Sequence, residues 1–183
     1  MPAPGELRTR KWIALSGFMG AGKTTVGRAL AQQIGWRFVD LDSRIEEHAG
    51  LTISAIFDRL GEPAFRQMES EILSRTLGES AERDQPLVLA LGGGTFSQPQ
   101  NATLLRSMGV AVIWLDCPLE ELFARCATMT NRPLFRDETG FRMLFRERLP
   151  SYEQADYRVP SNTEPRQVVE HILTLGILER VNA

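Results

Sequence analysis

The stretch Gly17-Phe18-Met19-Gly20-Ala21-Gly22-Lys23-Thr24 decides the fold of this chain. It matches the pattern G-x-x-x-x-G-K-[ST], follows the apolar run Trp12-Ile13-Ala14-Leu15, and precedes a segment with apolar residues at helical spacing. A strand, a glycine-rich turn and a helix in this order form a phosphate-binding loop, because glycines let backbone N–H groups surround phosphate oxygens. The pattern therefore predicts a site for the phosphates of a nucleotide.

The residues of this loop have distinct predicted roles. We expect the backbone of Gly20, Ala21, Gly22 and Thr25 to bind the nucleotide phosphates. Lys23 adds a positive charge on the β- and γ-phosphates, and Thr24 supplies a hydroxyl ligand for Mg²⁺. The loop does not specify the acceptor of the phosphoryl group. The identity of the acceptor must be inferred from residues elsewhere in the chain.

The composition narrows the class of protein. The 183 residues are 43% hydrophobic, which suits one domain with a sizeable core. The net charge of −2 gives no electrostatic footprint for nucleic acid or an anionic membrane. Cys117 and Cys126 lack the spacing of a metal site or a disulfide framework, and no apolar run approaches the ~18 residues of a membrane span. We therefore expect a cytoplasmic monomer that binds neither nucleic acid nor membrane, with His48 and His171 on its surface.

Strand-like and helix-like segments alternate along the whole chain. This alternation predicts an α/β fold with three layers, in which helices cover both faces of a central five-stranded parallel sheet. The predicted strands are residues 12–15, 37–39, 87–91, 110–115 and 157–159. We expect a single domain over residues 11–183 and a disordered lead-in over residues 1–10.

Local signals predict several helix boundaries. Ser43 is a candidate N-cap, and the spacing of Ile53, Ile56, Phe57 and Leu60 predicts one buried helix face. Gly61-Glu62-Pro63 is expected to break that helix. Pro150 is expected to kink or end a later helix.

Asp40 and Asp42 follow the predicted strand 37–39. Open parallel sheets bind ligands at this end of their strands. Asp40 could hold Mg²⁺ through water, and Asp42 could accept the proton of an acceptor hydroxyl. The alternative, an aspartate that caps the next helix, explains one of the two residues but not readily both.

Two further features suggest an acceptor site. Gly92-Gly93-Gly94 follows the apolar run 87–91, and glycines at a sheet edge allow close backbone approach to a substrate. Arg66 has Glu69 one helical turn later, where the carboxylate could hold the guanidinium. The alternatives are an ordinary turn and a surface ion pair that contributes little.

Several other arginines are candidates for binding anions. Arg125, Arg132 and Arg136 flank or occupy a polar segment, residues about 127–140, which has no periodicity and which we predict to be a mobile lid. Arg148 is a candidate for bidentate binding of an anionic substrate. Two other aspartates are weaker candidates. Asp58 fits D-x-x-G but lies in a helix pattern, and Asp116 ends a strand but ranks below Asp40 as a magnesium partner, because Cys117-Pro118 after it resembles a helix start that needs a cap.

Taken in order, these motifs resemble those of the shikimate kinases, a family of P-loop NTPase fold. The resemblance runs from about Lys11 to Leu175 and rests on the loop Gly17 to Gly27, the pair Asp40 and Asp42, and three later motifs. These are G-E-x-x-F-R at residues 61–66, the three glycines at 92–94, and R-P-L at residues 132–134. One departure is that Asn162 is followed by Thr163, where the family often has an arginine that packs on adenine.

The resemblance implies a reaction and a set of site residues. It implies transfer of the γ-phosphoryl group of ATP to shikimate, on the route to the aromatic amino acids, with Mg²⁺ as cofactor. The implied shikimate-binding residues are Asp42, Arg66, Glu69, Gly92, Gly93, Gly94 and Arg148, and the segment of about residues 43–80, which contains Arg66 and Glu69, is the implied set of substrate-binding helices. Lys23, Arg132 and the Mg²⁺ on Thr24 act on the phosphates, and Arg125 lies along adenine. Lys23, Asp42 and Arg132 are the implied catalytic residues.

Two alternatives remain at this point. One is a kinase of the same fold that acts on another sugar acid, such as gluconate. The other is a non-catalytic regulatory protein that binds nucleotide, although Lys23, Thr24, Asp40, Asp42 and Arg132 are all present.

Overall fold

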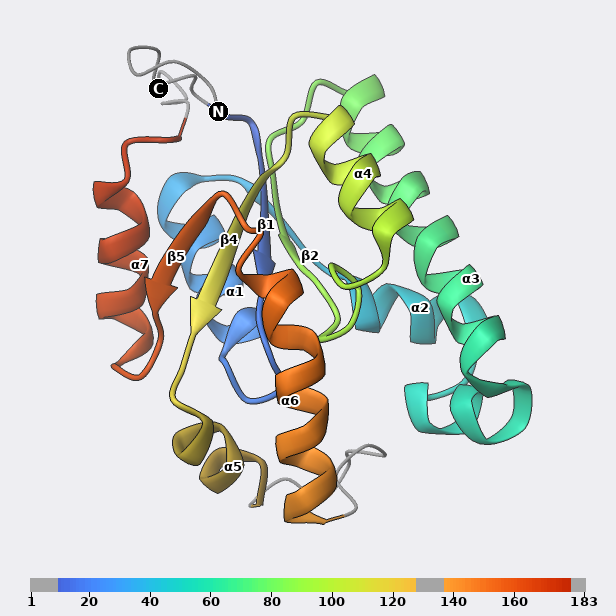
Figure 1. Cartoon of the computed structure of the whole chain (residues 1–183). Coiled ribbons are helices and arrows are strands. Elements are labelled where there is room, and N and C mark those ends of the chain that lie inside the picture. Colours follow the sequence, from blue (N-terminus) through green and yellow to red (C-terminus); the bar gives the residue numbers. More distant parts are fainter. Residues whose placement is uncertain (1–9, 128–136, 179–183) are drawn as a thin grey trace.

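The computed structural model describes residues 10–127 and 137–178 of the chain. Within these ranges, five parallel strands form one sheet in the order β2-β3-β1-β4-β5, and helices lie against both of its faces (Figure 1). The strands are β1 (Trp12–Ser16), β2 (Arg37–Asp40), β3 (Leu87–Ala90), β4 (Ala111–Asp116) and β5 (Tyr157–Pro160). The predicted five-stranded parallel α/β fold is confirmed.

The helices divide between the two faces of the sheet. They are α1 (Lys23–Ile34), α2 (Leu41–Ala49), α3 (Ile53–Glu82), α4 (Pro99–Ser107), α5 (Leu119–Ala127), α6 (Glu138–Tyr152) and α7 (Pro165–Thr174). Helices α1 and α7 pack together on one face, and α3 and α4 pack together on the other (Figure 1). The sheet is thus the middle layer of three.

Strand β1 shows why the central strands of the sheet are largely apolar. Ile13 and Leu15 belong to the core under α1 and α7, whereas Ala14 between them belongs to the core under α3 and α4. All three side chains are fully buried. Because successive side chains of a strand point to opposite faces, a strand with helices on both sides needs an unbroken apolar run.

The carboxyl ends of the strands bring the predicted site residues together. All strands point the same way, so the loop after β1, Asp42 after β2 and Gly92 after β3 lie at one edge of the sheet. Strand β1 lies between β3 and β4, which makes its carboxyl end the point where the strand order reverses. Ligands of open α/β sheets bind at such a point.

Some predicted helix boundaries are wrong. The N-cap of α2 is Asp40 and not Ser43, because Asp40 Oδ1 accepts a hydrogen bond from Ser43 N at 3.2 Å. By contrast, the predicted break at Gly61 is confirmed, because its backbone is not helical (φ 81°, ψ 169°) and a second helical segment of α3 then runs to Glu82. Leu60, predicted to be buried, is 52% exposed, because the change of direction at Gly61 ends the face that Ile56 buries.

The ends of the described chain and of α6 also differ from expectation. Helix α6 continues past Pro150 to Tyr152, so that of the two effects expected of the proline, a kink or the end of the helix, the end is wrong. Arg10, placed in the predicted lead-in, forms a bridge with Leu178, and its N–H donates to Ile177 O at 2.7 Å. Residues 1–9 of the lead-in lie outside the described residues.

Candidate active site

The glycine-rich loop has the backbone of a phosphate cradle. Gly17, Gly20 and Gly22 have φ values of 142°, 84° and 90°, which side chains with a Cβ rarely adopt. Lys23 Nζ donates to the carbonyls of Gly17 and Phe18 at 2.8 and 3.0 Å, so that its charge lies over the loop. Helix α1 begins at Lys23, and the positive end of its dipole points into the loop.

Thr24 and Asp40 form a pair of oxygen donors beside this loop. Thr24 Oγ1 donates to Asp40 Oδ2 at 2.6 Å, while Asp40 Oδ1 caps α2. Asp40 therefore caps the helix, as the alternative from the sequence predicted, and its other oxygen lies beside Thr24, the predicted magnesium ligand. Mg²⁺ prefers oxygen ligands and keeps several waters, so an exposed hydroxyl with a carboxylate behind it fits the ion.

The three glycines after β3 each lie against one predicted substrate-binding side chain. A Cβ on Gly92 would come within 2.7 Å of Asp42 Oδ1, and one on Gly94 within 2.7 Å of Arg66 Nη2. A Cβ on Gly93 would come within 3.2 Å of Arg148 Nη1. These glycines have no positive φ, so space and not backbone conformation requires them. The structure thus brings Asp42, Arg66 and Arg148 together around one turn.

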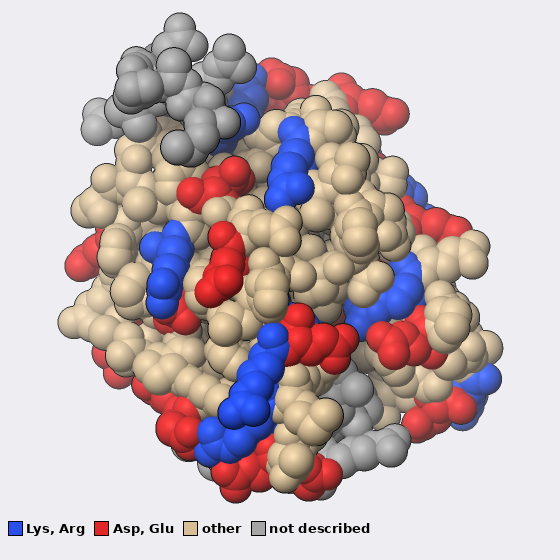
Figure 2. Space-filling view, in the orientation of Figure 1, with Lys and Arg blue, Asp and Glu red and all other residues tan. Residues whose placement is uncertain are grey.

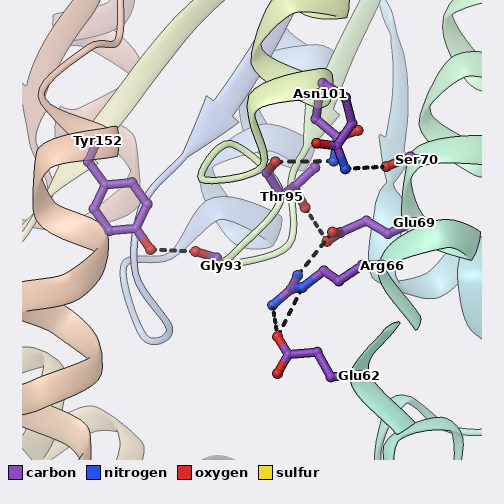
Figure 3. A network of polar contacts seen from close by, with 9 residues as sticks. Glu62, Arg66, Glu69, Ser70, Gly93, Thr95, Asn101 and Tyr152 are labelled. Atoms are coloured by element: carbon purple, nitrogen blue, oxygen red, sulfur yellow. Dashed lines mark hydrogen bonds and ion pairs between the residues drawn. The ribbon is translucent and has the colours of Figure 1, made fainter. Parts of the chain in front are cut away.

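Arg66 is held mainly by a buried carboxylate. Its Nη1 donates to Glu69 Oε2 at 2.9 Å, and the Glu69 side chain is 1% exposed (Figure 3). The Nε and Nη2 groups of Arg66 donate to Glu62 Oε1, and the Glu62 side chain is 61% exposed. The surface ion pair considered from the sequence therefore describes the contact with Glu62, not the one with Glu69.

Helix α6 connects the same turn to the phosphate-binding loop. Arg148 is buried, and its Cζ lies 5.8 Å from the centre of the Phe18 ring, a cation–π distance. One helical turn later, the Tyr152 hydroxyl donates to the carbonyl of Gly93 (Figure 3). The Tyr152 ring stacks on Trp114 of β4 with centroids 6.1 Å apart. Tyr152 thus fixes the turn to the sheet.

The pH dependence of stability tests the contact of Tyr152. Burial raises the pKa of Tyr152 to about 12. The folded pKa of Tyr152 exceeds the unfolded value of ~10, so the folded state favours the neutral hydroxyl. The contribution of this neutral hydroxyl to the free energy of unfolding is complete below pH ~10 and is lost as the pH rises through 12. Denaturant unfolding between pH 9 and 12 should show a loss of roughly 2 kcal/mol that Tyr152→Phe lacks. Parallel curves for the two proteins would contradict this prediction.

A cavity of about 380 Å³ adjoins the phosphate-binding loop. Its lining residues come from the loop, the start of α1, α5, the segment that joins β5 to α7 and the first turn of α7, namely Gly20, Ala21, Gly22, Thr25, Val26, Arg125, Ser161, Thr163, Glu164, Pro165 and Val168. Arg125 Nη1 donates to Gly20 O and Ser161 O, each at 3.2 Å, and its Nη2 pairs with Glu121. The cavity therefore extends from the phosphate cradle to the part of the chain where the sequence departs from the family pattern.

Some sequence candidates fall outside this group. Arg132, Arg136 and most of the predicted lid at 127–140 lie outside the described residues. Asp116 pairs with Arg158 of β5 at 2.7 Å, and Asp58 is exposed on α3. His48 and His171 are exposed, as predicted.

The sequence did not predict the contacts of three residues in or beside this cluster. Thr95 Oγ1 donates to Glu69 Oε1 at 2.6 Å, Asn101 Nδ2 donates to Thr95 O at 3.2 Å, and Tyr152 contacts Gly93. Their partners are distant in sequence or belong to the backbone, so no periodicity reveals them. The only signal was that Thr95 directly follows the three glycines.

A phosphate-binding loop at the switch point of a parallel sheet, beside two buried or half-buried arginines and an aspartate, defines the class of small-molecule P-loop kinases. The family model described as shikimate kinase matches residues 19–175. The chain belongs to the shikimate kinase family.

Individual relatives agree with this family. A shikimate kinase of Persephonella marina is 41% identical over 163 residues, which cover 88% of this chain and 96% of that protein. One from Trichormus variabilis is 40% identical over 178 residues, covering 93% of this chain and 94% of the relative. The solved shikimate kinase from Acinetobacter baumannii in complex with shikimate is 38% identical, has a TM-score of 0.82, and covers 89% of this chain and 90% of that one.

Proposed function

We propose that this protein transfers the γ-phosphoryl group of ATP to the 3-hydroxyl of shikimate, giving shikimate 3-phosphate and ADP. The observation that carries the proposal is the turn Gly92–Gly94, whose three missing side chains leave room for Asp42, Arg66 and Arg148. Two guanidiniums suit the carboxylate of a small acid, and the aspartate suits its hydroxyls. A nucleoside monophosphate would instead need a pocket for its base beside this cluster.

The chain's own residues supply most of the proposed mechanism. Arg66 and Arg148 bind the shikimate carboxylate, which fixes the ring so that its 3-hydroxyl faces the nucleotide. Asp42 accepts the proton of that hydroxyl as its oxygen bonds to the γ-phosphorus, and the bond from this phosphorus to the ADP oxygen breaks. Lys23 and the loop backbone at Gly20–Thr25 stabilise the charge on the phosphate oxygens.

The metal and the lid complete the proposal. Thr24, with Asp40 through water, would hold Mg²⁺, which when bound neutralises charge on the β- and γ-phosphates. Arg132, outside the described residues, is proposed to act on the γ-phosphoryl group, and Arg125 to line the adenine site. The helices within about residues 43–80 are proposed to bind shikimate, and the lid at about 127–140 is proposed to close once both substrates are bound, since water must be excluded before transfer.

The location, oligomeric state and partners of the enzyme are also part of the proposal. Among the described residues no helix is long and apolar enough to cross a membrane. On the face in Figure 2, basic and acidic side chains are interspersed, and no patch of one sign suggests nucleic acid. We propose a cytoplasmic monomer whose partners are ATP and shikimate, in one domain over residues 11–183.

A coupled assay of ADP release tests the proposed function. MgATP is supplied with shikimate, with gluconate or with no acceptor, and MgATP binding is measured on the same protein. We expect turnover with shikimate alone. Turnover with gluconate would contradict the proposed role of Arg66 and the three glycines in binding shikimate. Absence of turnover in folded protein that binds MgATP would favour the regulatory alternative.

A further inference from the structure

The carboxylate that holds Arg66 is itself held from a second element. Glu69 is fully buried on α3, and its two oxygens have different partners. Oε2 accepts from Arg66 Nη1 at 2.9 Å, and Oε1 accepts from Thr95 Oγ1 at 2.6 Å (Figure 3). A carboxylate in a buried position is stable in one orientation only when both of its oxygens are hydrogen bonded.

Thr95 is itself fixed in position by the turn. It is fully buried, and its N–H donates to Gly92 O at 3.2 Å, while its carbonyl accepts from buried Asn101 on α4 at 3.2 Å. A Cβ on Gly92 would come within 2.9 Å of Thr95 Oγ1 and 3.2 Å of Glu69 Oε1. The hydroxyl therefore lies where the glycine turn, α3 and α4 meet.

We infer that Thr95 is a positioning residue for shikimate binding, and this inference rests on the proposed function. Its hydroxyl fixes Glu69, Glu69 fixes the guanidinium of Arg66, and Arg66 binds the carboxylate of the acid. The turn Gly92–Gly94 also lies against Asp42 and Arg148. The Thr95 hydroxyl therefore sets the distance between Arg66 on α3 and the other residues of the proposed shikimate site. Its role is to position Arg66, without contact to the nucleotide.

The test compares Thr95→Val, which removes the hydroxyl and keeps the shape, with Thr95→Ser, which restores the hydroxyl. For Thr95→Val we expect the KM for shikimate to rise about tenfold, as for one lost buried hydrogen bond, with kcat changed less than about twofold. The affinity for MgATP should be unchanged, and Thr95→Ser should recover most of the shikimate affinity. An unchanged KM for Thr95→Val, or failure of serine to restore it, would overturn the inference.

A matched control separates positioning from general destabilisation. Thr76 is also buried on α3, and its hydroxyl donates to Ile72 O at 2.7 Å within the helix. Thr76→Val should lower the midpoint of thermal unfolding without changing the KM for shikimate. An equal rise in KM for both variants would mean that Thr95 contributes only stability.

A double-mutant cycle tests the path through Arg66. In an Arg66→Lys background the guanidinium fork is absent, so Thr95→Val should change shikimate affinity by less than about twofold. An equal fold-change in shikimate affinity on Thr95→Val in both backgrounds would contradict the idea that Thr95 acts through Arg66. If the unmodified protein shows no turnover with shikimate, the proposed function is wrong. If the unmodified protein turns over shikimate and Thr95→Val has the same KM for shikimate, only the positioning role of Thr95 is wrong.

Discussion

Replacing Asp42 by asparagine should lower kcat with shikimate by about 10²–10⁴-fold, the usual range for loss of a general base. Asparagine keeps the size of the side chain and can still hydrogen bond, but it cannot accept a proton at neutral pH. Asp42 lies in the first turn of α2, one residue after Leu41 and two after Asp40, with Gly92 against its carboxylate. The affinity for MgATP should stay the same, because Thr24 and Asp40 are unchanged.

Steady-state kinetics with shikimate and a separate titration with MgATP measure these two effects. Asp58→Asn is the matched control, because it makes the same chemical change at an exposed position on α3 and should leave kcat unaltered. If Asp42→Asn turned over at a rate within about twofold of the unmodified protein, general base catalysis at this residue would be excluded.

The parts of the fold that the sequence predicts are those determined by near neighbours in the chain. The loop Gly17–Thr24 and the apolar runs of the strands have local causes, namely backbone freedom and burial on two faces. The pair Asp40 and Asp42 could be placed at the sheet edge because the carboxyl ends of parallel strands share that edge. The N-cap of α2 was still misassigned, because Asp40 and Ser43 have equally good capping side chains.

The parts that could not be predicted depend on contacts between distant residues. Thr95 contacts Glu69 across 26 positions, and Tyr152 contacts Gly93 across 59. For the glycines the sequence indicated a close approach of a substrate, and it gave no sign that the side chains of Asp42, Arg66 and Arg148 also lie against them. Leu60 was misassigned although the break at Gly61 was predicted, because helical spacing alone does not tell that the buried face already ends at the residue before the break.

Replacing Arg66 by alanine should weaken shikimate binding by about 2–5 kcal/mol, the loss seen when one partner of a buried charge pair is removed. The Arg66 side chain is 14% exposed, and its main partner, Glu69, is nearly inaccessible to solvent. The variant removes a ligand of the substrate and also leaves Glu69 buried without its cation. The free energy of unfolding should therefore fall as well, by about 3–5 kcal/mol.

Two further variants separate the loss of binding from the loss of stability. Arg66→Lys keeps a cation beside Glu69, so most of the stability should return, but a single ammonium cannot replace the guanidinium fork on the shikimate carboxylate. Glu62→Gln removes only the exposed partner of Arg66, and such pairs contribute ~1 kcal/mol or less to stability. Shikimate titrations and denaturant unfolding of all three variants measure both quantities. Shikimate affinity unchanged in Arg66→Lys would mean that the charge alone binds the acid, and an equal loss of affinity in Glu62→Gln would return Arg66 to the role of a surface ion pair.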